Sequence, residues 1–263
     1  MIDQVFVMTL ERTSDRYEEA YQRLTSKGVP GSKIIRRNGV DNVNFNKTRE
    51  LFDFAIEEKG YSFLKRAVEI GLHNEVPITG FAQSLSYLDA LRYSVAHQET
   101  IVILHDDRKL NRDYADIVDA MTYIPLDYHV VSIPIDYYFR ETSGWRDFID
   151  SALISEWGER FYMGFQTPSD NFVVSPLGAA DMFARFSRML VERDIKYYED
   201  FLNLSIRNGE YHDTMYYCFN PDYFCLIDNV DEVPSLLYEN PGDEKIYNGT
   251  TPFLRPIEDT RDD

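Results

Sequence analysis

Short apolar runs along the chain are separated by segments with helical periodicity. Residues 4–10, QVFVMTL, form the first apolar run and predict a buried strand. After this run, apolar side chains recur at the spacing of one helix face, and Asp15 with Glu18 fits an N-terminal cap for that helix. Residues 33–40, KIIRRNGV, predict a second strand. This order of strand, helix and strand is typical of a parallel α/β sheet.

The same alternation continues through most of the chain. Further apolar runs predict strands, and amphipathic stretches of helical length predict the helices between them. The predicted strands are 101–104, 128–134, 171–176 and one or two within 214–228, and the predicted helices are 48–60, 79–96, 112–121, 177–193 and 197–209. The aromatic-rich segment 135–170 is interpreted as irregular. We therefore expect one α/β domain over residues 1–238, with a mostly parallel central sheet flanked by helices, and an acidic extension over 239–263 that contains Pro and Gly.

The chain carries a large excess of acidic residues. It has 45 Asp and Glu against 27 Lys and Arg, which gives a formal net charge of -18. Proteins that follow nucleic-acid phosphates normally show a basic face, and anionic membranes attract basic segments, so we expect neither partner. Residues 33–37, KIIRR, form the one tight basic cluster. This cluster could line a local basic pocket or mark the solvated edge of a strand, and we favour the strand edge.

Nothing in the sequence indicates export or a membrane span. Cys218 and Cys225 fit neither a zinc pattern nor a disulfide framework. No apolar run reaches the length of a membrane span, and the first ten residues lack the basic segment of a signal peptide. We therefore expect a cytoplasmic protein with reduced cysteines.

The apolar run of residues 101–104 ends on His105, Asp106 and Asp107. Adjacent carboxylates repel each other, so water, a basic side chain or a metal ion must offset their charge. In open α/β sheets, ligands bind beyond the carboxyl ends of the strands. Two carboxylates and an imidazole at such an end suit Mn²⁺ or Mg²⁺, and the imidazole favours Mn²⁺. The alternative is structural: one of the acids caps the next helix or pairs with the basic residues that follow.

Four segments carry polar residues at the ends of predicted strands and helices: VFVMTLERTSDR, AQSLSYLDALR, IVILHDDRKLNRDY and FVVSPLGAADMF. In this order they resemble glycosyltransferase family 25, the lipopolysaccharide and collagen sugar transferases, over about residues 4–205. The matching positions are Leu10, Arg12, Asp15 and Arg16 for the opening strand and helix start, 82–87 for the Gly-Cys-x-Leu-Ser-His helix, 104–107 for the Leu-Glu-Asp-Asp metal motif, and Ser175, Gly178 and Ala179 for the Ser-x-x-Gly-Ala segment.

The chain departs from the family pattern at four of these positions. Ala82, Gln83 and Tyr87 stand where the helix motif has glycine, cysteine and histidine. His105 stands where the metal motif has its first acid. An ion should therefore be held differently from the family norm, with a preference for Mn²⁺ over Mg²⁺.

The resemblance implies the glycosyltransferase A-type fold and inverting transfer of a sugar. The implied donor is a nucleotide-sugar such as a UDP-sugar, and the implied acceptor is a hydroxyl of a glycan or another molecule. A metal ion, Mn²⁺ or Mg²⁺, would offset the charge on the departing diphosphate. The implied site residues are His105 and Asp107 for the metal, and Arg12, Arg16, Ser86 and Asp106 for the donor. The two arginines could instead pair with neighbouring glutamates on the surface.

Inverting transfer also needs a general base for the acceptor hydroxyl. Residues 197–200, YYED, place an acid pair at a predicted helix start, which resembles the pair that supplies the base in many enzymes of this fold. Asp200 is the predicted base. Alternatively, Glu199 and Asp200 are first-turn acids favoured by the helix dipole.

Two other functions stay open. The chain could be a non-catalytic binding or scaffold protein on the same fold, which the departures at Tyr87 and His105 motivate. It could also be a glycosyltransferase that acts on modified nucleic acid, although the acidic balance counts against this.

Overall fold

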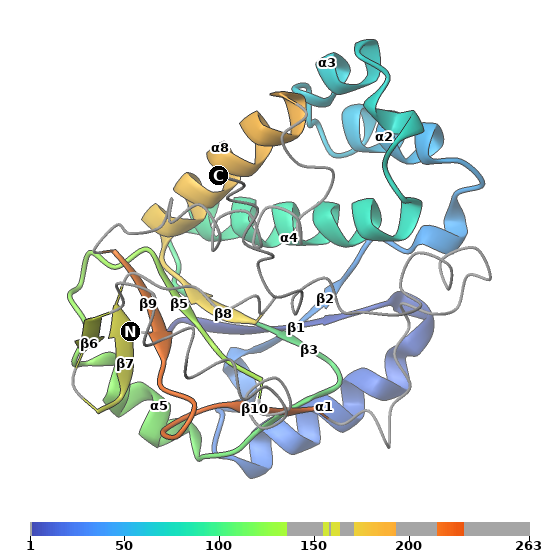
Figure 1. Ribbon diagram of the computed structural model, residues 1–263. Helices are drawn as coiled ribbons and strands as arrows, with labels where there is room; N and C mark the ends of the chain where they lie inside the picture. Colours follow the sequence, from blue (N-terminus) through green and yellow to red (C-terminus); the bar gives the residue numbers. More distant parts are fainter. Residues whose placement is uncertain (1, 136–154, 158, 164–170, 193–214, 229–263) are drawn as a thin grey trace, which may run out of the picture.

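An eight-stranded mixed sheet forms the centre of the structure (Figure 1), which is a computed structural model and describes residues 2–135, 155–157, 159–163, 171–192 and 215–228. The strand order is β2-β1-β3-β8-β5-β9-β7-β6, and β10 and β4 form a separate two-stranded sheet. The strands are β1 Gln4–Thr9, β2 Ile34–Asn38, β3 Ile101–His105, β4 Arg108–Leu110, β5 Val130–Ser132, β6 Ser155–Trp157, β7 Phe161–Met163, β8 Phe172–Val174, β9 Tyr216–Phe219 and β10 Leu226–Asp228.

Six of the eight strands in the main sheet run in one direction. β2 and β3 both pair with β1 in parallel, and β5, β9 and β6 have the same sense. β8 and β7 run the opposite way, and β8 lies between β3 and β5 although it follows both in the sequence. The expected single α/β domain with a mostly parallel sheet is confirmed, and so is its opening strand–helix–strand unit.

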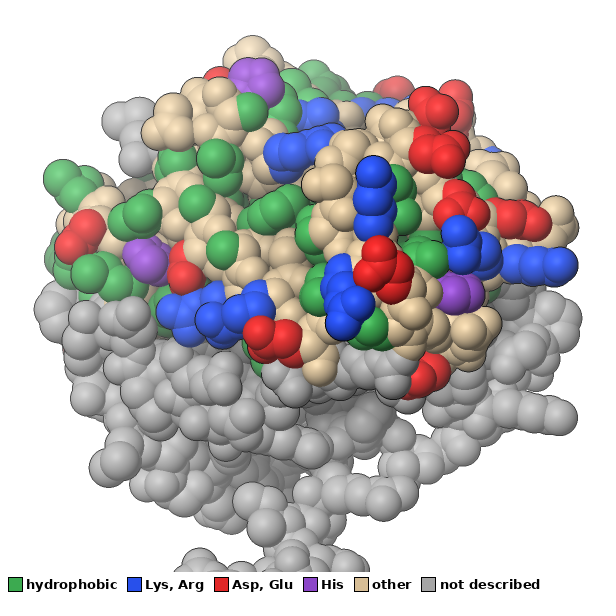
Figure 2. All heavy atoms as spheres, turned by 90° about the horizontal axis from the view of Figure 1, so that it is seen from above, with side chains coloured by type: hydrophobic (Ala, Val, Ile, Leu, Met, Phe, Trp, Pro, Cys, Tyr) green, Lys and Arg blue, Asp and Glu red, His purple; other side chains and the backbone are tan. Residues whose placement is uncertain are grey.

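Helices cover both faces of the sheet (Figure 1). α4 and α8 lie on one face with α2 and α3 beyond them, whereas α1 and α5 lie on the other face. The helices are α1 Ser14–Ser26, α2 Thr48–Glu57, α3 Leu64–Glu69, α4 Ile78–His97, α5 Tyr114–Met121 and α8 Pro176–Glu192, with short 3-10 helices η1 Glu11–Thr13, η2 Gly31–Lys33, η3 Asn42–Asn44 and η4 Leu72–Asn74. Figure 2 views the molecule from the side of α2, α3, α4 and α8, where acidic and basic side chains are interspersed.

Successive strand residues contribute to the two cores on opposite faces of the sheet. Ile101 and Ile103 of β3 pack together with Phe6 of β1 on the α4 side. Val102 and Leu104 belong to the core on the α1 side. This alternation also decides where the polar residues at the end of β3 point.

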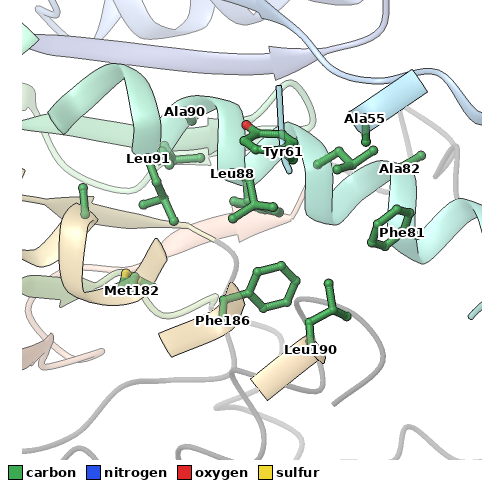
Figure 3. Close-up of a cluster of buried hydrophobic side chains, with 14 of the residues drawn as sticks. Ala55, Tyr61, Phe81, Ala82, Leu88, Ala90, Leu91, Met182, Phe186 and Leu190 are labelled. Atoms are coloured by element: carbon green, nitrogen blue, oxygen red, sulfur yellow. The ribbon is translucent and has the colours of Figure 1, made fainter. Parts of the chain in front are cut away.

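The core between α4 and α8 holds the helical layer on the sheet (Figure 3). Leu88 and Leu91 of α4 point toward α8, Leu88 over Phe186 and Leu91 over Met182, and all four side chains are fully buried. Full burial of such a side chain stabilises a fold by about 1.5–3 kcal/mol. This packing holds α4 and α8 together on one face of the sheet.

The start of α8 requires the small and polar residues found there. Oγ of Ser175 accepts a hydrogen bond from the backbone N–H of Gly178 at 3.1 Å and donates one to the carbonyl of Tyr128 at 2.7 Å. A Cβ atom on Gly178 would lie 2.0 Å from the carbonyl oxygen of His129. Ser175 therefore caps the helix, and only glycine at 178 permits its close approach to the chain before β5.

Three expectations about individual elements were wrong. α1 begins at Ser14, directly after η1, so Asp15 lies in the first turn and is not the cap. Asp113 is the N-cap residue of α5, so neither Asp106 nor Asp107 caps a helix. The other form of that structural alternative is confirmed, because Asp107 forms an ion pair with Arg108. The hairpin of β6 and β7 lies in the segment that was expected to be irregular, because its pairing with β9 is a long-range contact.

Other expectations are confirmed or lie elsewhere in the chain. Cys218 and Cys225 are buried free thiols, as predicted. The predicted helix over 197–209 with Asp200, and the extension over 239–263, lie outside the described residues. Among the helices that the structure describes, none combines the length and apolar character needed to cross a membrane.

Candidate functional site

The turn that ends β3 carries His105, Asp106 and Asp107. It leads from the main sheet into β4, which pairs with β10 in the small sheet. The side chains here continue the alternation of the strand. His105 contacts Tyr87 on α4, whereas Asp106 contacts Arg16 on α1. His105, expected to bind the metal, and Asp106, expected to bind the donor, therefore diverge to opposite faces of the sheet.

Asp106 is almost fully buried, with 7% of its side chain exposed. Its Oδ2 accepts a hydrogen bond from Oγ1 of Thr9 at 2.7 Å, and its Oδ1 lies 3.1 Å from Nη2 of Arg16. Burial raises the pKa of Asp106 above its ordinary value, although the Thr9 hydrogen bond and the Arg16 charge act in the opposite direction. Arg23 donates a further hydrogen bond to the backbone carbonyl of Asp106. The charge of this carboxylate is thus offset by a basic side chain of the protein.

Asp107 differs from Asp106 because one of its oxygens has acceptor capacity left. Its Oδ1 lies 3.5 Å from Nε of Arg108, and 16% of its side chain is exposed. This Oδ1 is buried and accepts no hydrogen bond from the described residues. An ionised carboxylate can accept about four hydrogen bonds, so Asp107 has acceptor capacity left, and a ligand would approach it through the exposed part of the side chain.

His105 is held from two sides. Its Nε2 lies 2.5 Å from the phenol oxygen of Tyr87, a buried residue of α4. Its backbone N–H donates to Oδ1 of the buried Asn171 at 3.1 Å. Nε2 either accepts the phenol proton or donates its own, and in both tautomers this nitrogen is engaged.

These contacts decide how a metal ion could fit. Asp106 has both oxygens engaged and His105 has Nε2 engaged, whereas Oδ1 of Asp107 accepts no hydrogen bond within the described part of the chain. Among the described residues, no three His, Cys, Asp or Glu side chains gather closely enough to hold an ion by themselves. One carboxylate is sufficient where a bound diphosphate and water complete the coordination. The residues present therefore fit a metal–diphosphate unit on Asp107.

Arg12 and Ser86, two predicted donor contacts, fix the loop after β2. Nε of Arg12 lies 2.7 Å from Oδ2 of Asp41, whose other oxygen accepts a hydrogen bond from the N–H of Val43. Oγ of Ser86 accepts a hydrogen bond from the N–H of Val40 at 2.8 Å. Arg12 is 34% exposed and can still reach a ligand, whereas Ser86 is buried.

Three of the four family-like segments meet at one edge of the sheet. β1, β2 and β3 are parallel, so their carboxyl ends lie together, and Thr9, Arg16 and Tyr87 all reach the turn after β3. The fourth segment does not join them. Its Ser175 and Gly178 follow the antiparallel β8, so they lie near the amino end of β3 and form the start of α8.

Thr9, Arg23 and Asn171 contact this turn and were not singled out from the sequence. Thr9 ends an apolar strand and Asn171 precedes one, so a polar residue at a strand end was the signal that could have identified both. Arg23 gives no such signal, because its contact depends on how α1 packs. Asp200, the predicted base, lies outside the described residues.

Comparisons with known proteins add no relative. No family model matches the chain, and no curated protein matches it significantly.

Proposed function

We propose that this chain is an inverting glycosyltransferase that uses a nucleotide-sugar, such as a UDP-sugar, as donor. The observation that carries the proposal is the contact between Tyr87 and His105. Where the helix motif of family 25 has histidine this chain has Tyr87, and where the metal motif has its first acid this chain has His105. The two departures replace an imidazole–carboxylate pair by a phenol–imidazole pair. An accidental alignment gives no reason for two departures to lie in contact.

In this proposal the donor binds across the carboxyl ends of β1, β2 and β3, where ligands of open α/β sheets are found. Arg12 and Arg16 supply positive charge at this edge. Thr9 and Arg16 hold Asp106 in place, and Asp106 in turn fixes the turn that carries Asp107.

Asp107 would hold Mn²⁺ or Mg²⁺ through its carboxylate. When bound, the ion would offset the charge that develops on the departing nucleoside diphosphate. Arg108 places a second cation beside Asp107. Asp200 remains the predicted base, which takes the proton from the acceptor hydroxyl as the new glycosidic bond forms.

Asp107→Asn tests the proposal because it removes the charge and keeps the shape. Binding of UDP with and without Mn²⁺ would be measured by calorimetry, and UDP-sugar hydrolysis and transfer on the same preparation. We expect the variant to lose the Mn²⁺-dependent part of UDP binding. We also expect hydrolysis and transfer to be more than about tenfold slower, which raises the activation free energy by at least ~1.4 kcal/mol. Asp53→Asn on α2 is the matched control, since this partly exposed acid pairs with Arg49 of its own helix and with no other residue that the structure describes.

Two outcomes would contradict the proposal. The wild type could bind neither UDP nor another nucleoside diphosphate, or Asp107→Asn could behave like Asp53→Asn. A ligand at 100 times its dissociation constant adds about 2.7 kcal/mol to stability, so a thermal shift would detect even a donor that turns over slowly.

The second candidate function is a non-catalytic nucleotide-sugar-binding protein. The engagement of Asp106 by Arg16 favours it, because that carboxylate is already neutralised by the protein. Binding of UDP without hydrolysis or transfer for any donor and acceptor would select this candidate. In both cases we propose the cytoplasm as the compartment, since Cys218 and Cys225 are free thiols.

A further inference from the structure

A pocket of about 550 Å³ lies between the edge strand β2 and helix α4. Its lining includes Arg37 of β2, Lys59 after α2, and Asp89, Arg92 and Tyr93 of α4. The basic cluster of residues 33–37 thus contributes to a pocket. The volume lies within the range of small-molecule sites, roughly 300–1,000 Å³.

Arg37 is the central cation of this pocket. Its guanidinium lies over the rings of Phe6 and Tyr93, at 4.2 and 4.0 Å from their centroids. It forms no hydrogen bond or ion pair with any residue that the structure describes, and its Nε is buried. A guanidinium has five N–H donors, and leaving buried donors unsatisfied is costly. The rings fix the orientation of Arg37, and its donors are left for a ligand.

The rest of the lining has one carboxylate that pairs with two cations. Asp89 lies 2.5 Å from Nζ of Lys59 and 3.3 Å from Nη2 of Arg92, and it also accepts a hydrogen bond from Tyr61. Together with Arg36 and Arg37, four Arg and Lys side chains share one acid in the pocket lining. Glu99 also acts electrostatically on Arg37 but does not line the pocket. The pocket is therefore locally positive in a chain of formal net charge -18.

We propose that this pocket binds the phosphate group of a small anionic ligand, with Arg37 as the main contact and Lys59 and Arg92 as further cationic contacts. A planar guanidinium with unused donors matches a phosphate, to which it can form two parallel hydrogen bonds. The pocket shares Ser86 with the predicted donor contacts, but Asp106 and Asp107 of the turn after β3 do not line it. Arg37 pairs with Met8 in the sheet and lies on the α4 side, whereas Thr9 and Asp106 meet on the α1 side. The inference does not depend on the proposed function.

Calorimetry on the full chain with inorganic phosphate, and separately with glycerol phosphate, tests the proposal. We expect saturable binding of at least one probe, and the pair distinguishes free phosphate from a phosphomonoester. Arg37→Gln should weaken this binding by about tenfold or more, since a charge-assisted pair is lost. Arg49→Gln, an exposed arginine on α2, is the control that should bind like the wild type.

Lys59→Gln is a second variant that removes a pocket cation but leaves the stacking of Arg37 on Phe6 and Tyr93 intact. It therefore separates loss of a ligand contact from a folding defect caused by Arg37→Gln. This variant should also bind more weakly than the wild type. Absence of saturable binding in the wild type up to millimolar phosphate would overturn the proposal and leave the cluster as a charged strand edge. Equal binding by the wild type, Arg37→Gln and Lys59→Gln would overturn it too, as would loss of phosphate binding in Asp107→Asn alone.

Discussion

The phenol oxygen of Tyr87 lies 2.5 Å from Nε2 of His105. This contact joins the middle of α4 to the last residue of β3, beside the two carboxylates of the turn. Tyr87 is 1% exposed, so its hydroxyl has no access to bulk water to replace the imidazole. The pair is therefore coupled: a change in one residue leaves a polar group of the other without its partner.

We predict that this coupling is measurable in a double-mutant cycle. Tyr87→Phe should lower the free energy of unfolding by about 1–3 kcal/mol, because it leaves Nε2 of His105 unsatisfied. His105→Gln should cost a similar amount, and the double variant should cost less than the sum of both. Urea unfolding of the four proteins would provide these values. Strict additivity would show that the two side chains do not interact.

A second pair of substitutions at the same two positions tests the resemblance to family 25. Tyr87→His with His105→Glu restores the residues of family 25 at both positions. We expect this double variant to be more stable than either single variant, because an imidazole and a carboxylate can pair again across the same gap. A double variant that is less stable than both singles would speak against the alignment on which the proposed function rests.

Arg16 and Asp106 support a prediction about stability and pH. Arg16→Met should lower the free energy of unfolding by about 3–5 kcal/mol, because it leaves a buried carboxylate without its cation. Asp106→Asn should cost less, since the amide oxygen can still accept the Thr9 hydrogen bond. Urea unfolding at neutral pH compares the two variants. Equal costs would indicate that Arg16 contributes by packing and not by charge.

The pKa of Asp106 gives the sign of the pH effect. Burial raises this pKa in the folded state, so the folded protein holds the proton more tightly than the unfolded chain. The stability that this group contributes is therefore present below its unfolded pKa and is lost as pH rises through the folded pKa. Arg16→Met raises the pKa further. The difference in free energy of unfolding between the wild type and Arg16→Met should thus become smaller as the pH is lowered toward about 4. A difference that becomes larger would contradict the role of Arg16 as the cation that offsets Asp106.

Much of the fold could be predicted because its signals are local. The apolar run of β1, the periodicity of α1 and the apolar run of β3 each lie within one short segment, and their order fixed the parallel unit. The partners of the site residues could not be predicted in the same way. Thr9 and Asp106 are 97 positions apart in the sequence, and no pattern within either segment indicates that they meet.

The sequence also left open what offsets the carboxylates after β3. Water, a basic side chain and a metal ion were all possible, and the metal ion was the favoured prediction, but the answer depends on how α1 packs beside β3. The structure places Arg16 on Asp106 and leaves an oxygen of Asp107 without a hydrogen bond from the described residues. Two neighbouring acids thus have different surroundings, and strand alternation is the physical reason.

Gly178 carries a prediction that tests the start of α8. Gly178→Ala places a methyl group where the carbonyl oxygen of His129 lies at 2.0 Å, and backbone cannot yield as a side chain can. We expect a loss of about 1–3 kcal/mol or more in the free energy of unfolding. Leu177→Ala is the control: this neighbour is exposed, so its truncation should change stability by less than ~0.5 kcal/mol. A neutral Gly178→Ala would mean that α8 does not approach β5 as closely as described.

The last prediction separates His105 from Asp107 as a metal ligand. Both residues were expected to hold the ion, with His105 setting a preference for Mn²⁺. Nε2 of His105 is in hydrogen-bond contact with the hydroxyl of Tyr87, whereas Oδ1 of Asp107 accepts no hydrogen bond within the described part of the chain. We therefore expect His105→Gln to leave the Mn²⁺ dependence of UDP binding nearly unchanged, while Asp107→Asn removes it.

Thermal shift with UDP at a series of Mn²⁺ and Mg²⁺ concentrations measures this dependence without requiring turnover. His105→Gln should lower the unfolding temperature of the protein alone, because the Tyr87 contact is lost, yet keep the half-maximal Mn²⁺ concentration within about threefold of the wild type, a difference of roughly 0.65 kcal/mol. Asp107→Asn should show the reverse: a normal unfolding temperature alone and no response to either ion. If His105→Gln raises the Mn²⁺ requirement as much as Asp107→Asn does, His105 must turn away from Tyr87 when the donor binds, and it is a ligand after all.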